Sequence, residues 1–264
     1  LRLLLQIFAA RSEQLSSVPT TAAPVATTLK STKFWAAKAA AWRAWYGHPS
    51  GIQFLSLAYA FLHVTVLSPH GALLTGYLYQ QGVPTWKLSL FRGAGALLGV
   101  LGVVAHPVLA RAFGRMADAL SATWLASFTL VAVASFWCLA PFATRDSGRG
   151  IGAAMSAFML AVCFARPGLY AFELGILNRS QELADARHRS AIGTVDAALT
   201  SVGTLVPYSS GLILHRPEEF YILVSCSAFF VCLGAVTYWM WMLLFRYLSD
   251  TGIRFRVPRK TTGT

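Results

Sequence analysis

Charged residues are scarce in this chain. Only 12% of its 264 residues are Asp, Glu, Lys or Arg, whereas about a quarter are charged in a typical soluble domain. Acidic residues are the scarcer class, with 10 Asp and Glu against 22 Lys and Arg and a formal net charge of +12. Because 56% of the residues are hydrophobic, this composition excludes an ordinary soluble globular domain.

Cysteines and catalytic motifs are also few. The four cysteines form no CxxC pair and lie in apolar stretches, which predicts buried thiols rather than a disulfide framework. No Ser–His–Asp order, zinc-protease motif or nucleotide-binding signature occurs. The glycines at 93, 95, 99 and 102 follow no predicted strand, so we interpret them as helix-packing positions rather than a phosphate loop. We therefore expect neither an enzyme nor a resident cofactor.

Long apolar runs are abundant. A bilayer core about 30 Å thick needs roughly 20 apolar residues per spanning helix, and six blocks reach that length. The predicted fold class is therefore all-α, a polytopic membrane protein with a six-helix lobe over residues 51–248. The six blocks are Gly51–Tyr79, Leu88–Ala110, Ala119–Ala143, Ile151–Leu177, Ser190–Leu214 and Phe220–Phe245.

The basic residues are distributed unevenly between the two sides of these spans. With a cytoplasmic first loop and alternating helices, sixteen Lys and Arg fall in inner segments and five in outer ones, while Arg166 lies within a span. This positive-inside bias predicts cytoplasmic ends. It also explains the charge without nucleic acid. The basic tail, residues 249–264, could contact anionic lipid or simply be solvated.

The segment before the first block changes character twice. The chain begins with Leu, and residues 1–10 are apolar but too short to span, so we expect the end of a preceding transmembrane helix. Residues 11–33 are rich in Ser, Thr, Ala and Pro and predict a cytoplasmic linker. Residues 34–50 carry aromatic side chains at helical spacing, which favours an interfacial amphipathic helix or a cytoplasmic helix packed on the bundle.

The first block contains a predicted helix break. Pro69 lacks an amide hydrogen and Gly71 weakens a helix, and such a break is tolerated at membrane depth only beside protein or a water-filled cavity. Ser68, Pro69, Gly71 and Thr75 are therefore candidate substrate-path residues. His70 lies inside the break and is the candidate metal ligand, since imidazole suits divalent transition metals. A proline kink with a structural histidine is an equal alternative.

Three intramembrane charges are further candidates. Arg166 and Glu173 are seven residues apart on one helix face and predict a gate or an internal ion pair, because charges within a span usually face a cavity or a partner. Asp196 could line the cytoplasmic vestibule, although we favour pairing with an arginine of the preceding loop. His63 shares a face with His70, but a structural role is the expectation. His106 is expected at the interface.

Several stretches of the chain together carry a family pattern. They are Tyr46–Pro49, Ala60–Leu62, Thr65–Leu67, Thr75–Gly82, Ala165–Leu174, Gln181–Glu182 with Arg189 and Ile192, and Arg216–Phe220. In combination they resemble the ferroportin family, solute carrier family 40. The resemblance covers roughly Trp42 to Phe245 and looks like the C-terminal half. It implies helices seven to twelve of a major facilitator exporter of ferrous iron, with cobalt or nickel as further cargo.

The sequence departs from the family where animal members bind metal. An Asp-Cys pair on their seventh helix is replaced by residues 68–72, and their eleventh-helix histidine falls at Pro207. Those ligands are therefore not transferred, and neither is hormone regulation, because the cysteine it needs is absent. The pattern looks more like that of plant, algal or fungal members, and His70 could serve as the ligand instead.

Three functional hypotheses follow. The favoured one is export of a divalent metal by alternating access, with membrane lipid and an N-terminal six-helix lobe as partners and no nucleic acid. The second keeps the fold and changes the cargo to an organic solute, coupled to protons through Asp196 or Glu173. The third is a non-transporting fragment or scaffold. The membrane involved, plasma or organellar, is left open.

Overall fold

The described part of the chain is all-α. The computed structural model describes residues 31–139, 148–184, 189–214, 216 and 219–250, and no strand occurs within them. The segments predicted at residues 1–10, at 11–30 of the linker and at 251–264 of the tail lie outside the described residues. The helices are α2 (Ser31–Tyr46), α3 (Ile52–His63), α4 (Ala72–Gln80), α5 (Thr85–Phe113), α6 (Met116–Leu139), α7 (Gly148–Leu183), α8 (Arg189–Ile213) and α9 (Phe220–Asp250).

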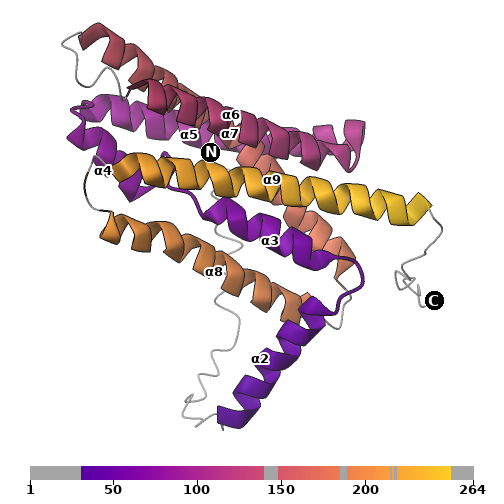
Figure 1. The fold of residues 1–264 in the computed structure, drawn as a ribbon. Helices are drawn as coiled ribbons and strands as arrows, with labels where there is room; N and C mark the ends of the chain where they lie inside the picture. The colour runs from indigo at the N-terminus through magenta and orange to yellow at the C-terminus, as the bar shows by residue number, and fades with distance from the viewer. Residues whose placement is uncertain (1–30, 140–147, 185–188, 215, 217–218, 251–264) are drawn as a thin grey trace, which may run out of the picture. The chain divides into compact units, whose positions relative to one another are not determined.

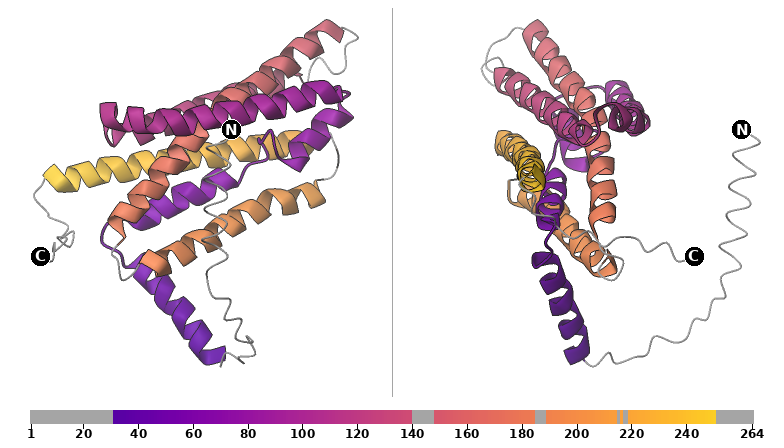
Figure 2. Two further views of the ribbon diagram at one scale, coloured as in Figure 1. Left: turned by 180° about the vertical axis from the view of Figure 1, so that it is seen from behind. Right: turned by 90° about the vertical axis from the view of Figure 1, so that its right-hand side faces the viewer.

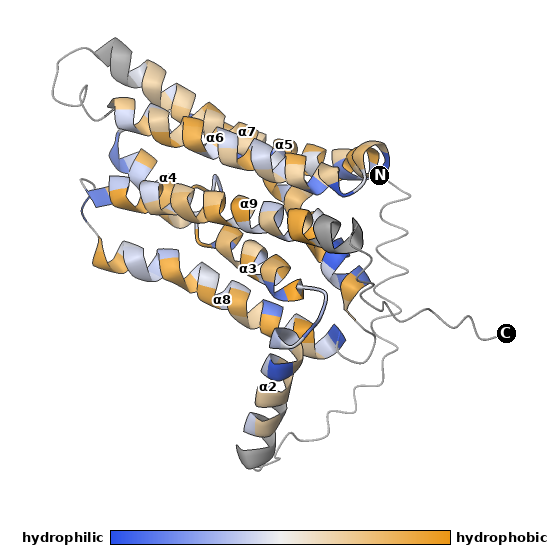
Figure 3. Cartoon of the chain, turned by 45° about the vertical axis from the view of Figure 1, so that its right-hand side comes forward, coloured by the Kyte–Doolittle hydropathy of each residue, from blue (hydrophilic) through white to orange (hydrophobic). Residues whose placement is uncertain are grey.

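Four of these helices are long and apolar enough to cross a membrane. They are α5, α6, α7 and α9 in the ranges Thr85–Phe113, Met116–Cys138, Gly152–Leu183 and Phe220–Leu244, and α3 is a shorter apolar helix. Figure 3 shows the apolar colours along these helices and the hydrophilic ones mostly near their ends and in the connections. The other two predicted blocks differ, since the first is interrupted and α8 carries Ser, Thr, Gly and Asp196 along its length.

The chain divides into two compact units, Leu1–Ala40 and Ala41–Thr264. In the first unit the structure describes only Ser31 to Ala40, and these residues are helical. There the Lys38 ammonium lies 5.3 Å from the centroid of the Trp35 ring. The second unit begins at Ala41, inside α2, and contains all the later helices. The prediction of an interfacial helix at residues 34–50 therefore overlaps α2, whose bounds lie a few residues earlier.

Within the second unit, α7 packs against both α5 and α6, and α6 also contacts α9. α9 packs in turn against α3, and α3 packs against α8. The three views in Figures 1 and 2 show the same order of helices, with α3 between α9 and α8. As a result α3 and the segment after it lie where α7, α8 and α9 can all reach them.

Glycines allow α5 to approach α7 closely. A Cβ added at Gly99 would lie 2.6 Å from Cε2 of the Tyr170 ring, and one added at Gly102 would overlap the backbone of Pro167. Gly93, on the same helix, has nothing within 4 Å of an added Cβ. Small residues therefore set the distance between α5 and α7 at particular positions, as their spacing predicted.

The apolar core divides into two main clusters. One surrounds α4 and includes Leu74, Phe158 and Phe220, all at most 6% exposed. The other surrounds α3 and includes Phe172 and Tyr238, both fully buried. Val66 and Leu67, in the segment between α3 and α4, belong to the first cluster, and Leu62 of α3 belongs to the second. The polar groups of this segment therefore lie close to both apolar clusters.

Candidate functional site

A break in the first predicted block separates α3 from α4. α3 ends at His63 and α4 begins at Ala72, so residues 64–71 leave the helix. Val64 to Val66 are β-branched residues, which fit a helix poorly, and Pro69 disfavours helical backbone at Ser68. The local sequence therefore ends one helix and delays the next by eight residues.

The break is held by side chains from other helices and from α4. The backbone N–H of Val66 donates a hydrogen bond of 2.9 Å to the hydroxyl of Ser227, on α9. Thr75 Oγ1 donates to the carbonyl of Gly71 at 2.8 Å, which anchors the first turn of α4. Such bonds are required, because unpaired backbone groups are costly away from water.

Arg166, on α7, satisfies another carbonyl of the break. Its side chain is buried, and Nη2 donates a hydrogen bond of 2.7 Å to the carbonyl oxygen of Leu67. No ion pair between Arg166 and Glu173 is recorded among the described residues. The guanidinium therefore binds the freed backbone and places a positive charge beside the break.

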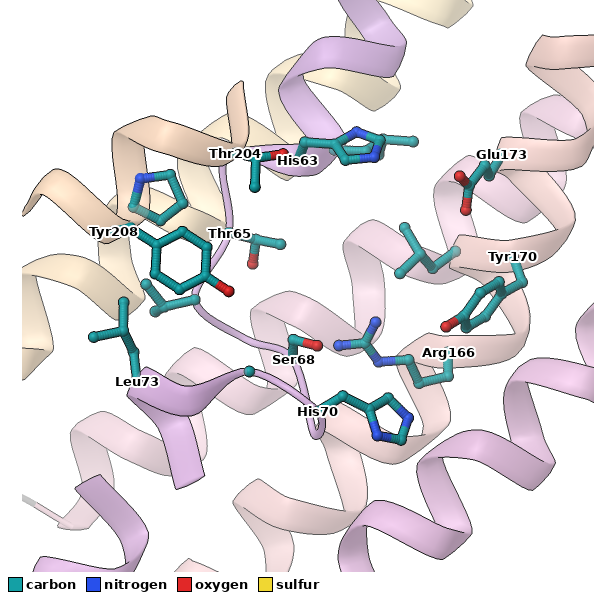
Figure 4. Close-up of a pocket in the computed structure, with 15 residues that line it drawn as sticks. His63, Thr65, Ser68, His70, Leu73, Arg166, Tyr170, Glu173, Thr204 and Tyr208 are labelled. Carbon is teal, nitrogen blue, oxygen red and sulfur yellow. The ribbon is translucent and has the colours of Figure 1, made fainter. Parts of the chain in front are cut away.

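A cavity of about 340 Å³ opens beside the break (Figure 4). Its walls come from the end of α3, the break, the start of α4, α7 and α8. Both polar and apolar side chains line it. The lining residues are Leu62, His63, Thr65, Val66, Ser68, His70, Gly71, Leu73, Arg166, Leu169, Tyr170, Glu173, Thr204, Pro207 and Tyr208.

The structure brings three of the five residues predicted at the break into the cavity wall. His70, Ser68 and Gly71 line the cavity, and His70 is exposed on this chain. Pro69 is not part of the wall, because it packs on Gly95 of α5, where an added Cβ would lie 2.8 Å from its Cγ. Thr75 bonds the backbone at the start of α4 instead.

The side of the cavity away from His70 carries a second polar group of residues. Glu173 Oε1 accepts a hydrogen bond of 3.0 Å from the hydroxyl of Tyr59, on α3. The His63 ring lies edge-on to the Tyr59 ring with centroids 4.8 Å apart, and its Nδ1 lies 3.0 Å from the Tyr59 carbonyl oxygen. His63 also lines the cavity, whereas the sequence analysis expected a structural role for it.

Asp196 lies in a different cavity, of about 680 Å³, between α3, α7 and α8. The Ser56 hydroxyl donates a hydrogen bond to Asp196 Oδ1. Trp45 Nε1, at the end of α2, donates to Ser56 Oγ at 2.9 Å. A serine on α3 thus holds this carboxylate. Of the arginines expected as partners, Arg189 bonds the carbonyl of Gln181 and Arg179 pairs with Asp118 and Glu182, while Arg187 lies outside the described residues.

A buried charged cluster escaped the sequence analysis. Asp118, in the first turn of α6, lies 2.9 Å from His106 Nε2 and 3.3 Å from Arg179 Nε, and it accepts a hydrogen bond of 3.0 Å from Tyr238. His106 is buried among the helices, with only 5% of it exposed, and its expected place at the membrane interface stays a prediction. A lone acidic residue opening an apolar span was the available signal. The cluster joins α5, α6, α7 and α9.

Metal-binding side chains are sparse around both cavities. Within the described part of the chain, no group of three or more His, Cys, Asp or Glu side chains is arranged to hold a metal ion. The wall of the cavity beside the break contains two imidazoles and one carboxylate. His70 lies at the end near the break, and His63 and Glu173 lie at the opposite end (Figure 4). A cation in this cavity would therefore meet one or two of these donors at a time.

Comparison with known proteins gives a consistent family. The family described as Ferroportin1 (FPN1) matches residues 9–231. Ferreportin of Bdellovibrio bacteriovorus is 32% identical over 191 residues, covering 72% of this chain and 41% of that protein. Solute carrier family 40 member 1 of Arabidopsis thaliana is 30% identical over 199 residues, covering 75% of this chain and 36% of that protein. Human ferroportin is 25% identical over 256 residues, covering 80% of this chain and 43% of that protein.

Solved structures agree with these sequence matches. A bacterial homologue of the iron transporter ferroportin in an outward-facing state matches with a TM-score of 0.66 and 30% identity, over 73% of this chain and 45% of that one. The inward-facing homologue matches with a TM-score of 0.64 and 31% identity, over 72% and 45%. The chain thus spans less than half the length of these proteins. It is an all-α, multi-pass membrane protein and belongs to the ferroportin family.

Proposed function

We propose that this chain forms the C-terminal lobe of a transporter that exports a divalent transition-metal ion, with ferrous iron as the first candidate. Alternating access would occur between this lobe and an N-terminal six-helix lobe. The uneven distribution of Lys and Arg supports cytoplasmic ends for this segment. Lipid would surround the outer helix faces. Iron would be cargo, and no resident cofactor is proposed.

The observation that carries the proposal is the interrupted helix beside a cavity. Broken helices lined by freed carbonyls mark substrate sites in membrane transporters, and residues 64–71 form such a break next to a cavity of about 340 Å³. His70 supplies an imidazole there, a donor that suits ferrous iron, cobalt and nickel. The names of the matched bacterial structures, which describe iron and metal transporters, support the same class of cargo.

His70 is exposed on this chain. Together with the sparse donors around the cavity, this exposure supports a metal site that the other lobe helps to build. Two imidazoles and one carboxylate at separate positions do not make a closed coordination sphere. A site shared between two lobes is also what alternating access requires, because the cation must change its exposure when the lobes move.

The test is loss of radioactive iron from cells that express the intact gene product. His70→Ala is expected to lower the efflux rate at least about tenfold, because even residues that only orient a metal ligand contribute 10- to 100-fold. His48→Ala removes an imidazole in the connection between α2 and α3 and is the matched control, with unchanged efflux expected. Unchanged efflux in His70→Ala at equal protein abundance would remove the role assigned to His70.

A further inference from the structure

The cavity beside the break has two chemically different ends. Figure 4 shows His70 and Arg166 near one another beside the break, while His63 and Glu173 point toward one another at the opposite end. Glu173 is the one acidic residue in the described wall, and Arg166 is the one residue there that is always charged positively. The charge of Arg166 therefore means that a cation beside His70 needs further donors, such as those of the other lobe, whereas Glu173 attracts a cation at the opposite end.

His63 is arranged as a metal ligand. Its Nδ1 lies 3.0 Å from the carbonyl oxygen of Tyr59, and a carbonyl oxygen can only accept a hydrogen bond. Nδ1 therefore carries the hydrogen, and in the neutral imidazole the lone pair is on Nε2. Histidines that bind metals usually donate their other ring N–H to a carbonyl or a carboxylate in this way.

The position of His63 in the fold adds to this preference. It is the last residue of α3, and the carbonyl end of a helix carries a partial negative charge that favours cations. The end of α3 therefore contributes an electrostatic attraction beside the imidazole.

Glu173 supplies the anionic donor. The structure records one hydrogen bond to its carboxylate among the described residues, from the Tyr59 hydroxyl to Oε1 at 3.0 Å. A carboxylate has about four lone-pair positions, so most of its capacity to accept remains. Carboxylate oxygen together with imidazole nitrogen is a donor set that ferrous iron and cobalt accept.

Tyr59 lies between two cavities. Its side chain lines the larger cavity, which contains Asp196, and its hydroxyl reaches Glu173, in the wall of the smaller one. Tyr59 therefore lies between the carboxylate of one cavity and the carboxylate of the other. The same hydroxyl occupies one oxygen of Glu173 and competes with a cation for it.

We propose that Glu173 and Nε2 of His63 form a second divalent-cation site at the end of the cavity away from His70, and that Tyr59 closes this site toward the cavity around Asp196. The site rests on the proposed function, since it presumes that a divalent metal enters the cavity. It would hold a transition-metal cation more tightly than the end near the break, because Arg166 lies at that end.

The experiment measures Co²⁺ binding to the purified intact gene product, by calorimetry and by the absorption bands of the bound ion. Glu173→Gln and His63→Ala are each expected to weaken binding at least about tenfold, since groups that only orient a ligand already contribute 10- to 100-fold. His63→Ala should also shift the absorption bands, because a nitrogen donor is lost. Glu182→Gln makes the same charge change at an exposed position of α7 and should bind as the wild type.

Tyr59→Phe separates a metal site from a merely structural hydrogen bond. Glu173→Gln and Tyr59→Phe both alter the same bond, so a structural role predicts that both weaken binding. The proposed site predicts opposite results, with Co²⁺ bound at least as tightly in Tyr59→Phe because the carboxylate loses its competing donor. Weakened binding in both variants, or wild-type binding in Glu173→Gln and His63→Ala, would overturn the proposal.

The two proposals can fail separately. His70→Ala, which tests the proposed function, is expected to lower iron efflux and still bind Co²⁺ with a nitrogen donor at Glu173 and His63. If the wild-type protein transports iron and the Glu173→Gln variant binds Co²⁺ as tightly as the wild type, the second site alone is overturned. A wild-type protein that neither binds Co²⁺ nor moves iron overturns both.

Discussion

Gly102→Ala is the sharpest test of how α5 and α7 pack. A methyl group at Gly102 would lie 2.7 Å from Cα of Pro167 and 2.9 Å from its carbonyl carbon, whereas nonbonded carbons prefer about 3.5–4.0 Å. The obstacle is backbone, which cannot rotate aside. α5 and α7 must therefore separate by roughly 1 Å, and overpacking of this kind costs about 1–3 kcal/mol.

Gly93→Ala is the matched control on the same helix. Nothing lies within 4 Å of a methyl group at Gly93, so this variant shows only the helix preference of alanine, about 1 kcal/mol in favour of folding. That preference is common to both variants and cancels when they are compared. The difference between them therefore isolates the clash of about 1–3 kcal/mol.

The assay is thermal unfolding of the purified intact gene product in detergent. At about 2–4 °C per kcal/mol for a chain of this size, Gly102→Ala should unfold roughly 2–12 °C below Gly93→Ala. Gly99→Ala should fall between them, since it meets a Tyr170 ring that can move. Equal melting temperatures for Gly102→Ala and Gly93→Ala would refute the argument that Gly102 sets the distance between α5 and α7.

Two further changes test the buried charges. Asp118→Asn removes the anion that His106 and Arg179 share, so the free energy of unfolding should fall by up to about 3–5 kcal/mol, measured by the same thermal assay; an unchanged melting temperature would contradict a clamping role. Arg166→Met removes the donor to the Leu67 carbonyl and should cost about 1–3 kcal/mol, while calorimetry should show tighter Co²⁺ binding because a positive charge has left the cavity. Weaker Co²⁺ binding in Arg166→Met would contradict the assigned electrostatics.

Local sequence features determined much of the fold. Apolar blocks about as long as a bilayer is thick predicted α5, α6, α7 and α9 within a few residues, because the hydrophobic requirement of a spanning helix is strong and local. The proline and glycine around His70 predicted an interruption, since Pro69 lacks an amide hydrogen and restricts the residue before it. The glycines of α5 predicted close packing for the same local reason.

The partners of polar groups could not be read from the sequence. Nothing local shows that Arg166 binds the Leu67 carbonyl or that Ser56 holds Asp196. These contacts join residues 99 and 140 positions apart. Asp118 was missed for a related reason. His106 lies on the preceding helix, but Arg179 and Tyr238 are 61 and 120 positions away on α7 and α9.

The sequence by itself determined the helical membrane fold, the place of the break and a histidine within it, because these depend on side-chain hydrophobicity and on the backbone limits of proline and glycine. Tertiary structure decided which end of the cavity carries which charge. Only the packing of α3 against α7 places Tyr59 on Glu173, and only the end of α3 at His63 leaves that imidazole beside the same cavity. Electrostatic interactions depend on distances between helices, and those distances are set when the helices pack.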